Sequence, residues 1–107
     1  MTESTVWSVY LLRNERKALY AGIATDVERR YREHLAGDSR AAKYTRGCAQ
    51  MELVYQCAIG GRSLASKVES RIKRLKRMEK LEIIERNESR AELLKRLRLE
   101  IAAADET

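Results

Sequence analysis

Apolar and polar residues are arranged in the first half of the chain in a way that is typical of short β-strands. Residues 5–12 are rich in β-branched and aromatic types and nearly apolar on both faces, which predicts a central strand. The polar residues 13–17 predict a hairpin loop, and residues 18–23 a second strand. Residues 50–58 alternate in the manner of a third strand. The residues expected to share one face of that strand are Leu53, Tyr55 and Cys57.

The hairpin places two tyrosines on one side of the sheet. A register that pairs Leu12 with Ala18 puts Tyr10 opposite Tyr20, with both side chains on the same face. This register is a hypothesis, because the sequence does not reveal the type of loop.

A helix is expected directly after the hairpin. Thr25 at the N-cap and Glu28 three residues later form a capping box, and the helix runs to about Ala36, with Gly37 just past its end. Its apolar residues follow helical spacing and are Val27, Tyr31 and Leu35.

The second half of the chain has helical spacing from Ser63 onward. Asn87 is a plausible break and cap, and residues 89–101 predict a last amphipathic helix for packing or for a dimer contact. The predicted order is therefore β-β-α-β-α-α-α, an α+β fold in which helices cover a small mixed or antiparallel sheet.

Length and charge narrow the class of protein. A chain of 107 residues suits one domain, within which we distinguish residues 1–87 from a C-terminal helix and tail, residues 88–107. Lys and Arg number 22 against 16 Asp and Glu, and this net charge of +6 favours a polyanionic partner. No stretch approaches 18 apolar residues, so nucleic acid is favoured over a membrane.

The two cysteines offer no metal or disulfide framework. Cys48 and Cys57 are nine residues apart, without a C-x-x-C pair or a cluster of histidines. We therefore expect neither a zinc site nor a disulfide, and we expect the cytoplasm as the location.

Four residues in the first third of the chain have the chemistry for cleaving a phosphodiester. Tyr10 and Tyr20 could point at a phosphate and help to deprotonate water, although strand tyrosines also serve as core or rim residues. Arg30 could donate two parallel hydrogen bonds to phosphate oxygens, or be a solvated charge. His34, the single histidine, could protonate a leaving oxygen or hold a phosphate. The alternative is a histidine at the end of a helix, where the helix dipole favours it.

Glu69 is the only acidic residue between Leu53 and Met78, in a segment full of Lys and Arg. A surface that only binds phosphate gains nothing from a carboxylate in its middle. A single carboxylate can hold Mg²⁺ or Mn²⁺, which keep most of their water ligands. The alternative is a salt bridge with a neighbour such as Arg71 or Lys73.

Basic residues that could contact the nucleic-acid backbone lie in two segments. A loop around Tyr44 combines an aromatic ring with positive charge, and the run Lys67–Lys80 holds many basic residues. An ordinary surface loop and a solvated helix face are the alternatives. The expected contact residues are Lys43, Tyr44, Arg46, Lys67, Arg71 and Lys73.

Taken in order, these motifs resemble the GIY-YIG nuclease superfamily over about residues 5–85. Ser8-Val9-Tyr10 stands where the family has Gly-Ile-Tyr, and Tyr20-Ala21-Gly22 stands where it has Tyr-Ile-Gly. The helix with Arg30 and His34 follows, and residues 42–47 and 66–73 look like the small stand-alone bacterial subgroup. Two departures, Ser in place of Gly and Ala in place of Ile, change backbone or packing positions rather than chemistry.

The resemblance implies a three-stranded antiparallel sheet flanked by helices and a divalent metal held by Glu69. It also implies that Arg30 stabilises the transition state, while Tyr10, Tyr20 and His34 arrange water and phosphate. The expected activity is metal-dependent endonucleolytic hydrolysis of DNA, branched or damaged, in repair or recombination. A non-catalytic nucleic-acid-binding module of the same fold is the alternative. We expect a monomer or weak homodimer, with a partner protein for targeting.

Overall fold

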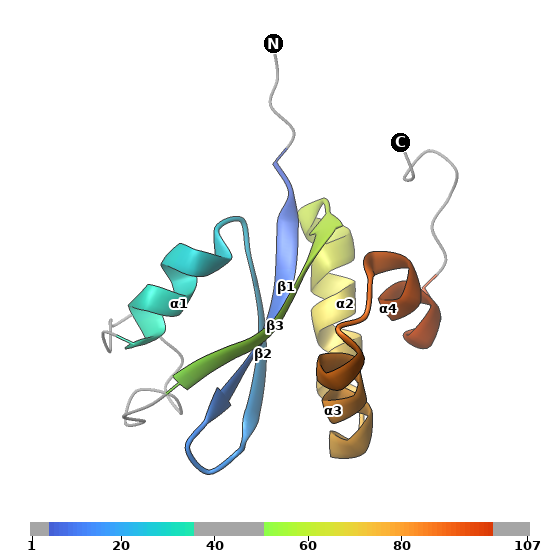
Figure 1. Ribbon diagram of the computed structural model, residues 1–107. Coiled ribbons are helices and arrows are strands. Elements are labelled where there is room, and N and C mark those ends of the chain that lie inside the picture. The colour runs from blue at the N-terminus through green and yellow to red at the C-terminus, as the bar shows by residue number, and fades with distance from the viewer. Residues whose placement is uncertain (1–4, 36–50, 100–107) are drawn as a thin grey trace.

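The protein is an α+β domain with a three-stranded antiparallel sheet between helices (Figure 1). The computed structural model describes residues 5–35 and 51–99. Its elements are β1 (Trp7–Asn14), β2 (Leu19–Ala24), α1 (Val27–Leu35), β3 (Met51–Gly60), α2 (Arg62–Arg74), α3 (Arg77–Arg86) and α4 (Arg90–Arg96). The predicted order β-β-α-β-α-α-α is thus confirmed.

β1 is the central strand, as its two apolar faces predict, and the sheet order is β2-β1-β3. The hypothetical hairpin register was wrong by two residues, because Tyr20 pairs with Leu12, and Tyr10 pairs with Gly22. The reason is the loop, which is shorter than expected. Only three residues separate the hydrogen-bonded Asn14 and Ala18, and Lys17 closes the loop in the left-handed conformation at φ 66°. A shift of two preserves the face, so both tyrosines still point to one side.

Helices cover both faces of the sheet. α1 lies on one face, and α2, α3 and α4 lie on the other (Figure 1). A bulge in β3 changes which face its residues reach. Leu11 pairs with Tyr55 and Leu12 with Leu53, so Val54 is an extra residue between them. As a result Leu53 packs on the α1 side and Tyr55 on the other, whereas simple alternation had placed them together.

α1 differs from its prediction in its first residue and in the residue that it buries in its last turn, while the predicted end at Ala36 and Gly37 lies outside the described residues. It begins one residue later than expected, since the side chain of Asp26, not Thr25, accepts the hydrogen bond of the Arg29 amide at 3.1 Å. Near its other end Leu35 is 49% exposed, and His34 is buried in the place that the apolar row had assigned to leucine. Burial of this polar ring is tolerated because the hydroxyl of Tyr10 is its hydrogen-bond partner.

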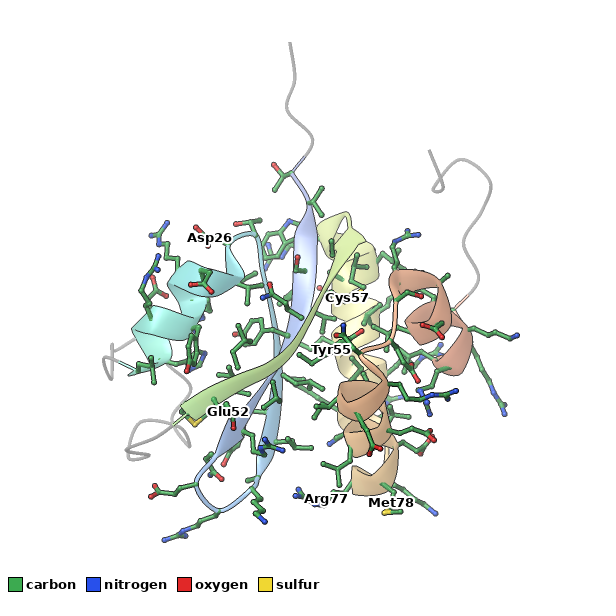
Figure 2. The ribbon with its side chains drawn as sticks, viewed as in Figure 1. Asp26, Glu52, Tyr55, Cys57, Arg77 and Met78 are labelled. Carbon is green, nitrogen blue, oxygen red and sulfur yellow. The ribbon has the colours of Figure 1, made fainter. Side chains whose placement is uncertain are left out.

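The C-terminal helices are attached to β3 by polar contacts around the buried Glu88. Tyr55 lies on the side of β3 that faces α2, α3 and α4 (Figure 2). Its hydroxyl donates to the Glu88 carbonyl at 2.8 Å. Arg96 pairs with the Glu88 carboxylate, and the pKa of Arg96 is raised mainly by this contact. Asn87 ends α3 in the left-handed conformation, as its predicted role as a cap requires.

Within residues 5–35 and 51–99, no helix is long and apolar enough to cross a membrane.

The side chain of Tyr10 closely approaches the backbone of its strand partner Gly22. A Cβ atom added to Gly22 would lie 2.5 Å from the Tyr10 hydroxyl oxygen and 2.6 Å from Cζ. Such separations are far below van der Waals contact, and Tyr10 is only 5% exposed, so the ring has little space to move into. Glycine at this position is therefore a packing requirement of Tyr10.

We predict that Gly22→Ala destabilises the protein by about 1–3 kcal/mol, because the methyl group overpacks the site and displaces the ring of Tyr10. Chemical denaturation of the two proteins measures the difference. Gly61→Ala is the matched control, since a Cβ there meets nothing within 4 Å and its φ of −66° suits alanine. Equal stability of Gly22→Ala and the wild type would contradict the assigned packing.

Candidate active site

The five residues expected to be catalytic line one cavity of about 220 Å³. They come from four different elements, β1, β2, α1 and α2, and from positions up to 59 residues apart. They are Tyr10, Tyr20, Arg30, His34 and Glu69. Residues so distant in sequence come together only through the fold, so their convergence is a property of the tertiary structure.

The cavity lies at β2, an edge strand, where side chains from both faces of the sheet meet. Tyr10 and Tyr20 share the face on which α1 packs, and α1 supplies Arg30 and His34. Glu69 is on α2, which covers the other face, yet it lines the same cavity. Only an edge strand allows such a meeting, because a central strand is flanked on both sides.

Tyr10 and His34 form the buried end of the site. The Tyr10 hydroxyl lies 3.4 Å from Nε2 of His34, and the two rings meet edge-on at 66° with centroids 6.3 Å apart. Burial, and secondarily the positive charge of Arg30, lower the pKa of His34 below its usual value, and Glu33 only partly offsets them. The imidazole is therefore neutral at neutral pH and can accept a hydrogen bond.

Arg30 is held in place by an acidic partner. Its guanidinium donates to Oε1 of Glu33 at 2.9 Å, and Arg29 pairs with the other oxygen of the same carboxylate at 3.4 Å. Burial acts to lower the pKa of Arg30, but hydrogen bonding with Glu33 and Tyr10 outweighs it and raises that pKa. Arg30 is thus a fixed cation beside the phenol of Tyr10.

At the opposite wall, Glu69 pairs with Lys73 one turn later on α2, with 3.1 Å between Oε2 and Nζ. This is the salt bridge that sequence analysis held as the alternative to metal binding. The salt bridge and metal binding do not exclude each other, because a carboxylate can exchange the ammonium of a lysine for a metal ion. Lys73 lines the cavity too, as one of the expected phosphate contacts.

The donor set fits a hard divalent cation better than zinc. Among residues 5–35 and 51–99, no group of three or more His, Cys, Asp or Glu side chains comes together, as a structural zinc site would need. Mg²⁺ and Mn²⁺ bind through one carboxylate with water and substrate phosphate as the other ligands. Glu69 is the acidic residue that lines this cavity in the described part of the chain, so its carboxylate is the one that would fit such an ion.

The other expected nucleic-acid contacts do not gather at this cavity. Lys67 is exposed on α2. Arg71 is directed toward α4, where it donates to the carbonyl of Leu97 at 2.8 Å and so connects two helices. The remaining three expected contacts, Lys43, Tyr44 and Arg46, lie outside the described residues.

Sequence reasoning missed three residues that support the site. Glu33 holds Arg30, and its spacing of three and four residues from two arginines was an available signal. Asn14 donates from Nδ2 to the hydroxyl of Tyr20 at 3.2 Å, a contact that depends on the loop geometry. Gly22 leaves room for Tyr10, and it was noted only as part of a motif.

Comparisons with known proteins identify the family of the chain. The family model of the GIY-YIG catalytic domain matches residues 6–96. The UPF0213 protein YhbQ of Escherichia coli K12 is 42% identical over 93 residues, covering 87% of this chain and 91% of that protein. YhbQ of Salmonella arizonae is 40% identical over 101 residues, covering 94% and 99%.

A solved structure supports the same assignment. The NMR structure of the UPF0213 protein BH0048 from Bacillus halodurans is 30% identical and has a TM-score of 0.50, covering 89% of this chain and 99% of that one. The family match spans most of the chain, including both tyrosine triplets, α1 and α2. This protein therefore belongs to the GIY-YIG family, a family of nucleases.

Proposed function

We propose that this protein is a metal-dependent DNA endonuclease that hydrolyses phosphodiester bonds. The observation that carries the proposal is the convergence of Tyr10, Tyr20, Arg30, His34 and Glu69 on one cavity. A base, a fixed cation and a carboxylate around a space of this kind are what phosphodiester hydrolysis needs.

Arg30 binds the scissile phosphate in this proposal. Its guanidinium can donate two parallel hydrogen bonds to the non-bridging oxygens, a geometry that lysine cannot reproduce. Because Glu33 already holds the side chain, little conformational freedom is lost when the phosphate binds. The positive charge then counters the negative charge that grows on the non-bridging oxygens in the transition state.

Tyr10 and His34 orient the attacking water. Neutral His34 accepts a hydrogen bond from the Tyr10 hydroxyl, and the oxygen of that hydroxyl is then directed to accept a hydrogen bond from water. The proton of the water passes to this pair as the oxygen attacks phosphorus. Tyr20, held by Asn14, borders the same space and positions the phosphate.

Glu69 would hold the divalent ion. A bound Mg²⁺ or Mn²⁺ supplies charge stabilisation to the phosphate oxygens and the leaving oxygen. The carboxylate of Glu69 and the ammonium of Lys73 already form a pair in the cavity, and in the complex Lys73 can turn to the phosphate instead.

The cellular role completes the proposal. An overall charge of +6 favours a polyanionic substrate such as DNA, and we propose branched or damaged DNA in repair or recombination as the natural substrate. We further propose that it acts in the cytoplasm as a monomer or weak homodimer, with a partner protein to direct it to its substrate.

We predict that purified protein cuts branched or flapped DNA only with Mg²⁺ or Mn²⁺. Arg30→Lys should cut at least about 100-fold more slowly, because it loses the bidentate contact to the transition state. Glu69→Gln should bind DNA but leave it uncut. Gel assays with labelled linear, nicked, flapped and branched DNA, each with metal or with EDTA, measure both effects.

Two matched variants control for nonspecific loss of charge. Arg32→Lys changes an exposed arginine of the same helix, and Glu85→Gln changes an exposed carboxylate on α3. Both should cut at the wild-type rate. Normal cleavage by Arg30→Lys or Glu69→Gln would refute the assigned roles. DNA that is shifted but never cut by any protein would favour the binding module.

We also predict a loss of activity in acid that follows the protonation of His34. The pKa of His34 in the folded protein lies below its usual 6.5. The neutral ring therefore makes its full contribution to the free energy of unfolding above about pH 6.5. It is lost as the pH falls through the folded pKa, and cleavage should decline over the same range. NMR can follow the titration directly, because this is the only histidine. A midpoint above 6.5 would contradict the assigned environment.

A further inference from the structure

A second cavity of about 260 Å³ adjoins the catalytic one. The two share Ile23 and Arg30, so Arg30 borders both. The further walls of the second cavity come from Trp7 at the start of β1 and from the segment where β2 passes into α1. Asp26, which lies in this segment, is labelled in Figure 2. A ligand in this cavity would therefore lie directly beside a phosphate bound by Arg30.

Trp7 is the only tryptophan in the chain, and it lies beside a bulge in the sheet. Trp7 pairs with Gly60 and Ser8 with Ala58, so β3 contributes an extra residue between the two pairs. Such a bulge increases the local twist of the sheet next to Trp7. The ring is half-buried, packs partly on the core, and has the guanidinium of Arg62 5.2 Å from its centroid.

The charges around the second cavity are balanced. Its charged residues in the described part of the chain are two arginines and two carboxylates, and Glu33 pairs with both Arg29 and Arg30. Apart from the phosphate placed on Arg30, a further anion or a metal ion would find no excess of opposite charge here. An aromatic wall with balanced polar groups instead suits a neutral, planar ligand that has hydrogen-bonding edges.

We propose that this cavity binds one unpaired nucleobase of the DNA strand whose phosphate lies on Arg30. The inference rests on the proposed function and adds a substrate preference to it. Stacking of a base on an aromatic ring is worth about 1–3 kcal/mol. The volume lies just below the roughly 300–1,000 Å³ of sites for drug-sized ligands, as expected for a ligand as small as one base.

This subsite selects for substrates with an unpaired base next to the scissile bond. In a continuous duplex the same base is stacked and paired, and extracting it costs a few kcal/mol. A flap, gap, bulge or branch provides it at little cost. The enzyme should therefore bind such junctions more tightly than intact duplex of equal length.

The emission of Trp7 reports directly on this contact. We predict that flapped DNA in EDTA quenches the fluorescence of the wild-type protein. Moving a single abasic residue along the flap should abolish quenching at one position near the junction. The same abasic residue should weaken binding about 5- to 150-fold, which is the stacking energy above expressed as a ratio. Labelled DNA and fluorescence anisotropy measure the affinity.

Two variants test whether Trp7 itself is responsible. Trp7→Leu should lose the preference for the base-bearing over the abasic flap, whereas Trp7→Phe should keep most of it, because an aromatic face remains. Thermal melts establish that both are folded. If Trp7→Leu does not fold, the abasic scan on the wild-type protein decides alone.

The outcomes separate this inference from the proposed function. DNA binding with no abasic position that matters, or equal discrimination by wild type and Trp7→Leu, overturns the base subsite and leaves the nuclease assignment intact. Failure to bind any DNA overturns both.

Discussion

The close approach of Tyr10 to Gly22 is the constraint on which the site depends. Because position 22 has no side chain, the phenol of Tyr10 can lie across the neighbouring strand and reach His34 on α1. The hairpin register sets this meeting, and the register in turn follows from a three-residue loop closed by Lys17. A local turn geometry at one end of the sheet thus determines the geometry of the site.

Each charged group of the site is held by a neighbour of opposite charge before any substrate binds. Arg30 is fixed by Glu33, and Glu69 is paired with Lys73. Such pairing limits the reorganisation that binding a phosphate requires, and this is how preorganised sites stabilise developing charge. The neutral state of His34 follows from the same arrangement, since burial and the charge of Arg30 both oppose its protonation.

Sequence reasoning was most successful where structure is local. The order of elements followed from apolar spacing, because each strand and helix buries its own face. What it missed depends on tertiary geometry. The alternation of apolar and polar residues reveals neither the bulge at Val54 nor the hairpin register set by Lys17. The burial of His34 in place of Leu35 depends on a partner from a distant strand. The meeting of Glu69 with the tyrosines was expected from the family resemblance alone, because apolar spacing does not reveal the order of strands.

Locating the metal and the phosphate together would test most directly whether the cavity at β2 is the active site. Crystals of the protein with Mn²⁺ and a flapped DNA that carries a slowly cleaved phosphorothioate would reveal the ion by its anomalous scattering. We expect one ion bound by the carboxylate of Glu69, with the scissile phosphate on Arg30 and beside Tyr10. An ion bound elsewhere, or a phosphate outside the cavity at β2, would contradict this expectation.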